Sequence, residues 1–545
     1  MCGILAVIGT KATAAEAQKQ VSLMDHRGPD EWDVKALPSG ILAHQRLSIN
    51  DLHTGKQPIE SKNGAWLIHN GEIYNHQSIR IDYSERYRFS SSSDSEVILP
   101  LYYEMGADLV HKLDGVFAFV LIDGEKVLVA RDAIGVKPLY YGVDEHEQLW
   151  FASEIKSLID KVTVIKEFPP GYYYTNEEGF VQWFKPEWLS EAIPTGLPDE
   201  LKDSFVKAVE KRLMSDVPLG VLLSGGLDSS LVASIVAREM KLKGKTVSSF
   251  SVGLSGESPD LVKAKKVAEF IGTDHHEIVF TPDQGIELLK ELIYKLESYD
   301  VTTIRASTPM YIMSKYIRKQ GVKVVLSGEG ADEIFGGYLY FKNAPSKEEF
   351  HHECVRRIKR LNSADVLRAD RSTMGAGIEA RVPFLDLDFL KAAMKLNPAY
   401  KVMDGGRIEK YILRQAFADP NNPYLPDEVL WRQKEQFSDG VGYSWVDTLK
   451  DHAEAQVSDH EFSKAAEMYP FNTPNTKEAF FYRSIYEEFY DKAEASKLVK
   501  KWIPKWQDDK DPSGRASTHH DQTYYEDGEE EFARSLVEEC AMVAV

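Results

Sequence analysis

The sequence is short of cysteine, of long apolar runs and of basic charge, and each shortage argues against a class of protein. Its three cysteines (Cys2, Cys354 and Cys540) are odd in number and far apart, which argues against a disulfide framework and for a reducing compartment. No apolar run approaches the roughly 18–20 residues that span a bilayer. The opening stretch MCGILAVIGTK also lacks the basic region of a signal peptide. We therefore expect a cytoplasmic protein without membrane segments.

The sequence contains fewer basic than acidic residues. Against 65 Lys and Arg residues stand 85 Asp and Glu residues, which gives a formal net charge of −20 over 545 residues. A protein whose main role is to bind nucleic acid needs a basic surface to neutralise phosphates, so we expect no nucleic-acid partner. With 43% hydrophobic and 11% aromatic residues, the chain is too apolar to be disordered. At about 100–200 residues per domain, its length predicts more than one domain.

Two patterns of secondary structure divide the chain. Residues 2–190 show many short apolar strands and few helices, which predicts an antiparallel α+β domain. Segment 192–199 (AIPTGLPD) has the composition of a linker. From 200 to 505, strands alternate with helices, one of them expected over 284–295, which predicts a helix-rich α/β domain on a parallel sheet. Segment 506–545 contains the acidic block YYEDGEEEF and is expected to be a poorly ordered tail.

Cys2 directly follows the initiator methionine. If Met1 is removed, this residue carries both a thiol and a free α-amine, whose unperturbed pKa is about 7.7–8.0. The amine then lies close enough to act as the general base for its own side chain, as in enzymes with an amino-terminal threonine nucleophile. On position alone, however, a cysteine at residue 2 is more often an accident of sequence than a nucleophile.

Further motifs give Cys2 a chemical context. HRGPD (26–30) predicts a tight turn, and Arg46 in HQRLSIN is a strand-borne cation suited to a carboxylate. Asn70 and Gly71 in NGEIYNH stand at a strand end, where a side-chain amide and an unhindered backbone N–H can together form an oxyanion hole. Asp94 in SSSSDSE could bind a substrate ammonium, although such a residue is usually only a helix cap.

As a set, MCGI, HRGPD, RLSI and NGEIYNH resemble the class II glutamine amidotransferase domain over roughly residues 2–190. The resemblance implies an N-terminal nucleophile fold, which is an αββα sandwich. It also implies that Cys2 attacks the amide of glutamine and that Asn70 and Gly71 stabilise the tetrahedral oxyanion. One departure is Ser92, which stands where relatives usually have Gly and leaves the backbone shape of this loop open. The residues implied to bind glutamine are Arg46, Leu47, Ser48, Ile49, Asn50, Asn70, Gly71, Glu72 and Asp94.

The motif SGGLDSS (224–230) follows the apolar strand LGVLL and precedes an amphipathic helix. A glycine turn that leads into a helix N-terminus presents backbone N–H groups to an anion. The motif is neither a Walker A loop nor GxGxxG. It resembles the pyrophosphate loop of ATP pyrophosphatases, which cleave ATP between the α- and β-phosphates. That resemblance implies a Mg²⁺ ligand at Asp228, although this residue can also simply cap the helix.

Other motifs of the second half carry charged and polar residues. SGEGADEIFGGY (327–338) follows the apolar strand VKVVL, so Glu329 and Asp332 are expected at the carboxyl end of a parallel strand, where ligands of open α/β sheets bind. The segment ESYDVTTIRASTPM contributes Thr302 and Arg305, and WRQKEQFSDGVGYSW contributes Lys434. Taken singly, most such residues would be surface charges.

Together with ARVPFLD (380–386), these motifs resemble the glutamine-hydrolysing asparagine synthetase family across nearly the whole chain. The resemblance implies ATP-dependent synthesis of asparagine from aspartate and glutamine through β-aspartyl-AMP, which releases AMP, pyrophosphate and glutamate. It implies ATP and Mg²⁺ as cofactors without a prosthetic group, Asp228 and Asp332 as Mg²⁺ ligands, and Glu329 as general base for ammonia. Thr302, Arg305 and Lys434 are assigned to the pyrophosphate or aspartate site. The implied ATP-binding residues are Leu223, Ser224, Gly225, Gly226, Asp228, Ser229, Val252, Ser327 and Gly328.

Two chemical problems require a closed connection between the two sites for that reaction. Free ammonia is mostly ammonium at neutral pH, which has no lone pair for attack, and an acyl-adenylate is open to hydrolysis. We therefore expect a dry passage from Cys2 to the second site. Because relatives are often homodimers, a homodimer with only small-molecule substrates is expected.

Three other functions compete with this interpretation. A β-lactam-synthetase-like cyclase shares the architecture but needs no nucleophile at Cys2. An amidotransferase that feeds a sugar-phosphate or phosphoribosyl domain would share only the first half and lack SGGLDSS. A non-catalytic regulator or storage protein would carry damaged motifs, and here Cys2, Arg46, Asn70, Asp228 and Glu329 are all intact.

Overall fold

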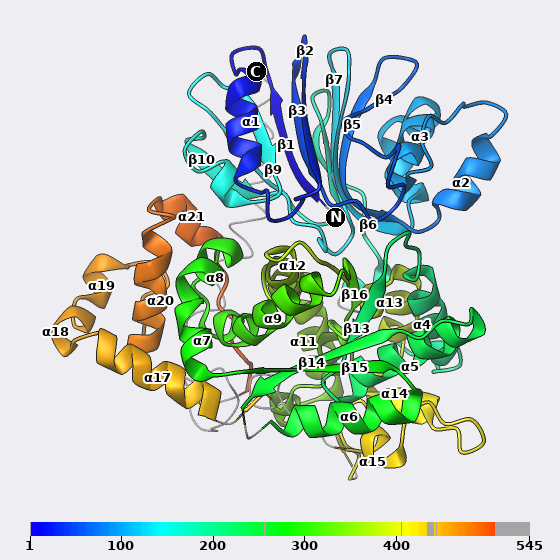
Figure 1. The fold of residues 1–545 in the computed structure, drawn as a ribbon, viewed down its shortest axis with the longest axis vertical. Coiled ribbons are helices and arrows are strands. Elements are labelled where there is room, and N and C mark those ends of the chain that lie inside the picture. Colours follow the sequence, from blue (N-terminus) through cyan, green and yellow to red (C-terminus); the bar gives the residue numbers. More distant parts are fainter. Residues whose placement is uncertain are drawn as a thin grey trace.

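The computed structural model describes residues 2–190, 192–255, 258–404, 406–432, 441–442 and 444–506. The predicted site residue Lys434, Cys540 and the acidic tail from residue 507 onward lie outside these ranges. In the view of Figure 1, the sheets built from the amino-terminal sequence lie above a third sheet and its helices.

Two six-stranded antiparallel sheets form the amino-terminal part of the chain. The first has the order β10-β8-β9-β1-β3-β2 and the second has the order β12-β11-β7-β6-β5-β4. The first sheet comprises β1 (Cys2–Ile8), β2 (Glu31–Leu37), β3 (Gly40–Arg46), β8 (Tyr140–Val143), β9 (Leu149–Ala152) and β10 (Val164–Glu167). The second comprises β4 (Ile59–Glu60), β5 (Trp66–Ile73), β6 (Gly115–Asp123), β7 (Lys126–Arg131), β11 (Tyr172–Thr175) and β12 (Gly179–Gln182).

Period-two alternation of apolar residues explains why these sheets stack. In β1, Ile4 and Ala6 lie in the core between the two sheets, whereas Leu5 and Val7 belong to a core on the outer face. The outer core of the first sheet includes the buried face of α1 (Ala14–Ser22), which begins with a capping box between Thr13 and Glu16. On the outer face of the second sheet lie α2 (His76–Tyr83) and α3 (Ile98–Met105), so the layers run helix, sheet, sheet, helix.

A five-stranded parallel sheet organises the second part of the chain, with the order β15-β14-β13-β16-β17. Its strands are β13 (Leu219–Leu222), β14 (Ser248–Leu254), β15 (Asp274–Phe280), β16 (Val324–Leu326) and β17 (Glu379–Arg381). Successive strands are added on one side of β13 as far as β15, and the chain then returns to add β16 and β17 on the other side. The carboxyl ends of β13 and β16 therefore meet at the switch point, where open α/β sheets bind ligands.

Helices cover both faces of this sheet, as the alternation of strands and helices predicts. The helices α5 (Leu227–Leu242) and α6 (Pro259–Ile271) contribute to one core cluster, whereas α9 (Val301–Lys319) contributes to the other. The single helix expected over 284–295 is wrong, because α7 (Pro282–Glu287) ends before α8 (Leu289–Leu296) begins. The backbone N–H of Leu288 bonds the Gly285 carbonyl, which tightens and ends the first helix.

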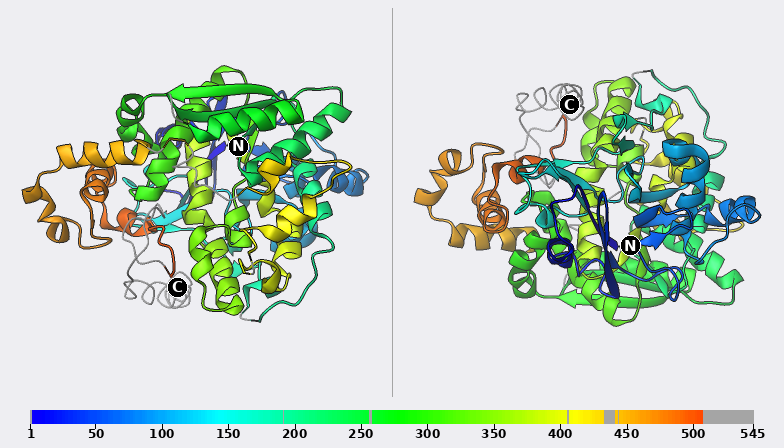
Figure 2. Two further views of the ribbon diagram at one scale, coloured as in Figure 1. Left: turned by 90° about the horizontal axis from the view of Figure 1, so that it is seen from below. Right: turned by 90° about the horizontal axis from the view of Figure 1, so that it is seen from above.

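The remaining helices lie around this sheet or in an arm at one side. Figures 1 and 2 show the arm as the orange helices α17 to α21. Within the described residues, no helix combines the length and apolar character needed to cross a bilayer. The helices around the sheet and in the arm are α4 (Leu201–Lys211), α10 (Ala331–Phe335), α11 (Lys347–Lys359), α12 (Asp365–Met374), α13 (Leu387–Met394), α14 (Tyr411–Phe417), α15 (Asp427–Leu430), α17 (Ser444–Gln456), α18 (Asp459–Phe462), α19 (Ala465–Met468), α20 (Lys477–Glu487) and α21 (Ala493–Leu498).

Buried charges join the two parts of the chain. The Arg27 guanidinium contacts Asp370 of α12 at 2.8 Å and Glu154 at 3.0 Å. Arg371 reaches the same Glu154 at 2.5 Å and Glu297 at 2.9 Å, and all five side chains are at most 5% exposed. Burial opposes ionisation of Glu154, but the neighbouring cations hold its pKa well below the usual value. The interface therefore depends on charges that compensate one another.

Replacing Arg371 by Ala should destabilise the protein strongly, because it removes a buried cation that, together with Lys156, contacts both Glu154 and Glu297. Breaking a buried ion pair in this way costs about 3–5 kcal/mol. Urea unfolding followed by tryptophan fluorescence should show a markedly lower midpoint. A matched variant, Lys161→Ala, removes a more exposed ion pair to Glu16 and should cost only about 0–1 kcal/mol. Equal midpoints for the two variants would contradict this role of the interface.

Candidate active sites

Cys2 lies at the beginning of β1, where three neighbouring elements hold its backbone. Strand pairing places Cys2 opposite Arg46 of β3. The Cys2 amide donates to Asn70 Oδ1 at 2.9 Å, and Arg27 Nε donates to the Cys2 carbonyl at 3.1 Å. The residue is 6% exposed. Cys2 thus lies where the two antiparallel sheets meet the buried charges that join the two parts of the chain.

Asn70 and Gly71 lie together inside β5, not at its end as the NGEIYNH motif predicts. The hydrogen bond from Cys2 fixes the Asn70 amide, and its Nδ2 is buried without a hydrogen-bond partner. Gly71 has φ +156, and a Cβ there would stand 2.0 Å from the Val116 carbonyl of β6. Only glycine fits this position, so the backbone N–H is unshielded by a side chain. A buried, unsatisfied amide donor beside a thiol is suited to stabilise an oxyanion.

Arg46 is held in place by partners at both ends of its guanidinium. It donates to Glu31 at 2.7 Å and to the backbone carbonyl of Asp51 at 2.5 Å. Asp51 in turn accepts the backbone N–H of Ser92 at 2.7 Å. Ser92 is not among the residues with positive φ, so this loop does not require the glycine found in relatives. The contacts from Arg46 to Asp51 and from Asp51 to Ser92 thus connect the predicted carboxylate site to the loop that contains Asp94.

Asp94 and Glu72 are carboxylates in a low-dielectric environment. Burial raises the pKa of Asp94, whose Oδ2 accepts the Ile73 amide at 2.8 Å. Burial and the nearby Glu379 raise the pKa of Glu72 well above its usual value. Asn50 donates to Glu72 at 2.5 Å. A substrate ammonium bound between these buried carboxyl groups would favour their charged forms, which would in turn attract it.

The remaining residues that are predicted to bind glutamine also contact the second part of the chain. Leu47 and Ile49 pack with Val324 and Met374 in a buried apolar cluster. The Ser48 amide donates to Asp30 Oδ2 at 2.8 Å. The RLSIN segment is therefore part of the interface as well as of the predicted site.

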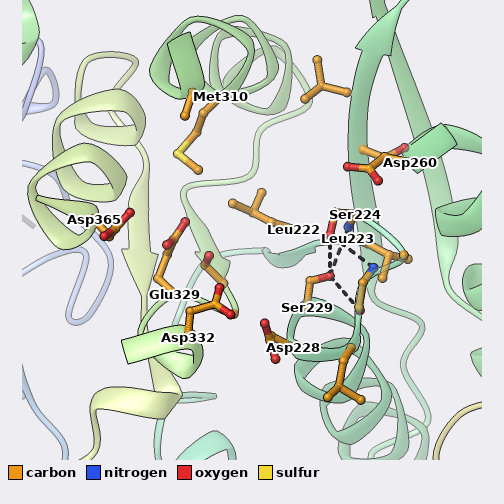
Figure 3. Close-up of a pocket in the computed structure, with 18 of the residues that line it drawn as sticks. Leu222, Leu223, Ser224, Asp228, Ser229, Asp260, Met310, Glu329, Asp332 and Asp365 are labelled. Carbon is orange, nitrogen blue, oxygen red and sulfur yellow. Dashed lines mark hydrogen bonds between the residues drawn. The ribbon is translucent and has the colours of Figure 1, made fainter. Parts of the chain in front are cut away.

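The second site is a cavity of about 210 Å³ at the switch point between β13 and β16. All predicted ATP-binding residues line it, as do Thr302, Arg305, Glu329 and Asp332. In Figure 3, Asp228 and Ser229 of α5 face Glu329, Asp332 and Asp365 across the cavity. The fold thus brings together residues that lie more than 100 positions apart in the sequence.

Two loops form the floor of this cavity. Gly225 has φ +74, and a Cβ there would stand 2.6 Å from the Ala264 amide of α6. A Cβ on Gly328 would stand 2.7 Å from the Ser229 amide. The loop after β16 therefore packs against the N-terminus of α5, where the Ser224 and Ser229 hydroxyls lie 3.0 Å apart. Glycines at these positions leave the helix N-terminus open to an anion.

Lys410 was not singled out by any sequence motif, yet it holds the two predicted metal ligands. Its ammonium contacts both Asp228 and Asp332, and the residue is almost fully buried. It adopts φ +58, an uncommon conformation for a residue with a side chain. Asp228 Oδ1 is buried without a hydrogen-bond partner. Hard carboxylate oxygens of this kind fit Mg²⁺, although the described residues hold no group of three or more His, Cys, Asp or Glu side chains arranged for a metal.

Glu329 belongs to a second ionic group on the other side of the cavity. Arg368 of α12 contacts Glu329 at 2.8 Å and Asp365 at 2.9 Å. Arg305 lines the cavity but also forms a buried pair with Glu478 of α20, at 2.5 Å. Sequence reasoning missed Asp365, Arg368 and Lys410, because all three lie outside the motifs.

The helix α12 spans the distance between the two sites. Its first turn carries Asp365 and Arg368 at the cavity, and its later turns carry Asp370 and Met374 at the interface. Asp370 binds Arg27, which donates to the Cys2 carbonyl. One rigid helix thus connects the backbone of the predicted nucleophile to the wall of the second cavity.

The chain is similar to known proteins over nearly its whole length. Residues 1–174 match the family described as glutamine amidotransferase domain, and residues 200–349 and 342–510 match asparagine synthase. The chain is 49% identical to glutamine-hydrolysing asparagine synthetase 2 of Oryza sativa subsp. japonica, over 97% of this chain and 94% of the relative. It is 48% identical to asparagine synthetase 3 of Arabidopsis thaliana, over 97% of each. This chain belongs to the glutamine-hydrolysing asparagine synthetase family.

Proposed function

We propose that the protein makes asparagine from aspartate, with ATP as activator and glutamine as nitrogen donor. The observation that carries the proposal is the presence of two separate constellations in one chain, a thiol beside an amide donor and a nucleotide-sized cavity at a sheet switch point. AMP, pyrophosphate and glutamate are the other products. By family resemblance, the enzyme acts as a cytoplasmic homodimer.

At the first site, Cys2 attacks the side-chain amide of glutamine. Its α-amine, free once Met1 is removed, takes the thiol proton. Asn70 Nδ2 and the Gly71 N–H donate to the oxyanion of the tetrahedral intermediate. Arg46 binds the α-carboxylate of glutamine, and Asp94 binds its α-ammonium, with the RLSIN segment and Glu72 completing the pocket. Ammonia leaves, and water then releases glutamate from the thioester.

At the second site, the loop of Ser224, Gly225 and Gly226 holds the phosphates of ATP, and Leu223, Val252, Ser327 and Gly328 hold its adenosine. The aspartate β-carboxylate displaces pyrophosphate to give β-aspartyl-AMP. Asp228 and Asp332 would hold Mg²⁺, which neutralises charge on the leaving pyrophosphate. Lys410, Thr302, Arg305 and Lys434 supply further contacts to pyrophosphate or aspartate. Glu329 accepts a proton from ammonia as it attacks the acyl carbon.

Delivery of ammonia through the interior explains why both reactions share one chain. Ammonia released at Cys2 stays unprotonated only if it avoids bulk water, and the anhydride survives only if water is excluded. The path proposed here runs along α12, between the Arg27–Asp370 pair and Arg368.

Replacing Asn70 by Ala should lower the glutaminase kcat by about 10²–10³, because one oxyanion donor is lost. Cys2→Ala should abolish glutamine use altogether. Both variants should keep ammonium-dependent asparagine synthesis, measured by amino-acid analysis. The control Asn176→Ala removes an exposed turn contact to Glu125 and should change neither activity. Loss of both activities in Cys2→Ala would refute the division of labour.

Replacing Lys410 by Met should lower ATP–pyrophosphate exchange by about 10²–10³, the effect of about 3–5 kcal/mol for a buried charge left without its partner. Without the positive charge of Lys410, the carboxylates of Asp228 and Asp332 would repel the triphosphate. Glutaminase activity should remain. Lys391→Met, on an exposed position of α13, serves as the control. Release of ADP rather than AMP by the wild type would contradict adenylation.

Isotope competition tests the interior passage. With [¹⁵N-amide]glutamine and unlabelled ammonium in the medium, asparagine should retain most of the label, because ammonia from Cys2 does not mix with solvent. Mass spectrometry of the product measures the retained fraction. Dilution of the label to the ratio in the medium would exclude the passage while leaving both half-reactions intact.

A further inference from the structure

The last described segment of the chain forms part of the wall of the synthetase cavity. Residues 499–506, which we name the C-terminal strap, follow α21 and return across the second part of the molecule (Figure 2). Trp502 of this strap lines the cavity and is 7% exposed. No motif identified in the sequence includes this residue, and the proposed mechanism does not use it.

Two anchors hold the strap at this position. The Trp502 amide donates to Asp300 Oδ1 at 3.0 Å, and Asp300 also caps α9 by accepting the Thr303 amide at 2.8 Å. On the other side, Arg357 of α11 donates to the Ile503 carbonyl at 2.8 Å. The same guanidinium lies 4.0 Å from the Trp502 ring centroid, which is a cation–π geometry. The indole is therefore fixed between α9 and α11.

The neighbours of Trp502 place it on the acidic side of the cavity. Its ring packs edge-on against Tyr338 at 5.1 Å. Tyr338 lines the cavity too, and its hydroxyl lies 3.5 Å from Asp365, the partner of Arg368. Arg368 in turn contacts Glu329, the proposed base. An aromatic wall thus stands beside the groups at which aminolysis takes place.

We infer that Trp502 excludes water from the acyl-adenylate and so determines that ammonia, not water, consumes it. This inference rests on the proposed function. In aminolysis, ammonia nitrogen bonds to the β-carbonyl carbon, the bond from that carbon to the AMP phosphate oxygen breaks, and one proton is released. In hydrolysis, water oxygen forms the new bond, the same bond breaks, and aspartate, AMP and two protons result. Hydrolysis therefore spends ATP without making asparagine.

The ratio of pyrophosphate to asparagine measures this partition directly. With ammonium as the only nitrogen donor, the glutaminase site is bypassed, and each hydrolysed intermediate adds one pyrophosphate without an asparagine. Trp502→Ala should raise the hydrolysed fraction about tenfold over the wild type at equal ammonium, because water gains access to the intermediate. The excess should fall as ammonium is increased, since the two nucleophiles compete. Trp502→Phe, which keeps an aromatic ring, should restore most of the coupling.

A matched control lies four positions along the same strap. Trp506 packs against Phe341 at 6.3 Å and its carbonyl accepts Asn343 Nδ2 at 2.9 Å, away from the cavity wall. Trp506→Ala should leave the ratio at the wild-type value. A ratio unchanged in Trp502→Ala, with both products reduced in proportion, would overturn the inference and leave a purely structural role. If Trp502→Ala does not fold, Trp502→Leu is compared in the same assay. A wild type that makes no asparagine from ammonium would instead refute the proposed function.

Discussion

The interface between the two parts of the chain depends on compensation of buried charge. Glu297 illustrates the constraint, because it adopts φ +55 at the end of α8 and yet its carboxylate is fully buried. Its oxygens accept the backbone N–H groups of Ile155 and Lys156 at 2.8 Å and contact Arg371 at 2.9 Å. A charge removed from water is tolerated only when its partners are fixed in number and position. The amino-terminal sheets are therefore held in one orientation over the synthetase helices.

That fixed orientation has a chemical consequence. Arg27 binds both the Cys2 carbonyl and Asp370, so the predicted nucleophile and α12 share one side chain. Two positions before Asp370 in α12, Arg368 contacts Glu329 in the cavity. The predicted nucleophile and the wall of the synthetase cavity are thus connected through Arg27 and α12. A flexible linker between independent domains would leave their relative position free.

The sequence predicted the parts of each site that local chemistry defines. Gly71 and Gly225 stand in recognisable motifs, because a Cβ at either position would clash with the backbone, and Cys2 is recognisable from its position in the sequence. Lys410 and Trp502 could not be predicted in this way. Their partners lie far away in the sequence, at Asp228 and Asp300, and no local pattern reports such contacts.

Lys410 shows why such distant residues matter for the chemistry. In the proposed function this cavity binds a polyanion, yet its walls carry the carboxylates of Asp228, Asp332, Glu329 and Asp365. Unpaired, these groups would repel a triphosphate at short range. Arg368 offsets one of the two negative charges of Glu329 and Asp365, and Lys410 offsets one of the two on Asp228 and Asp332. The left-handed backbone at Lys410 costs conformational energy, about 1–3 kcal/mol, which is stored where the charge is needed. The acidic residues can then bind a metal ion or a substrate ammonium without excluding the nucleotide.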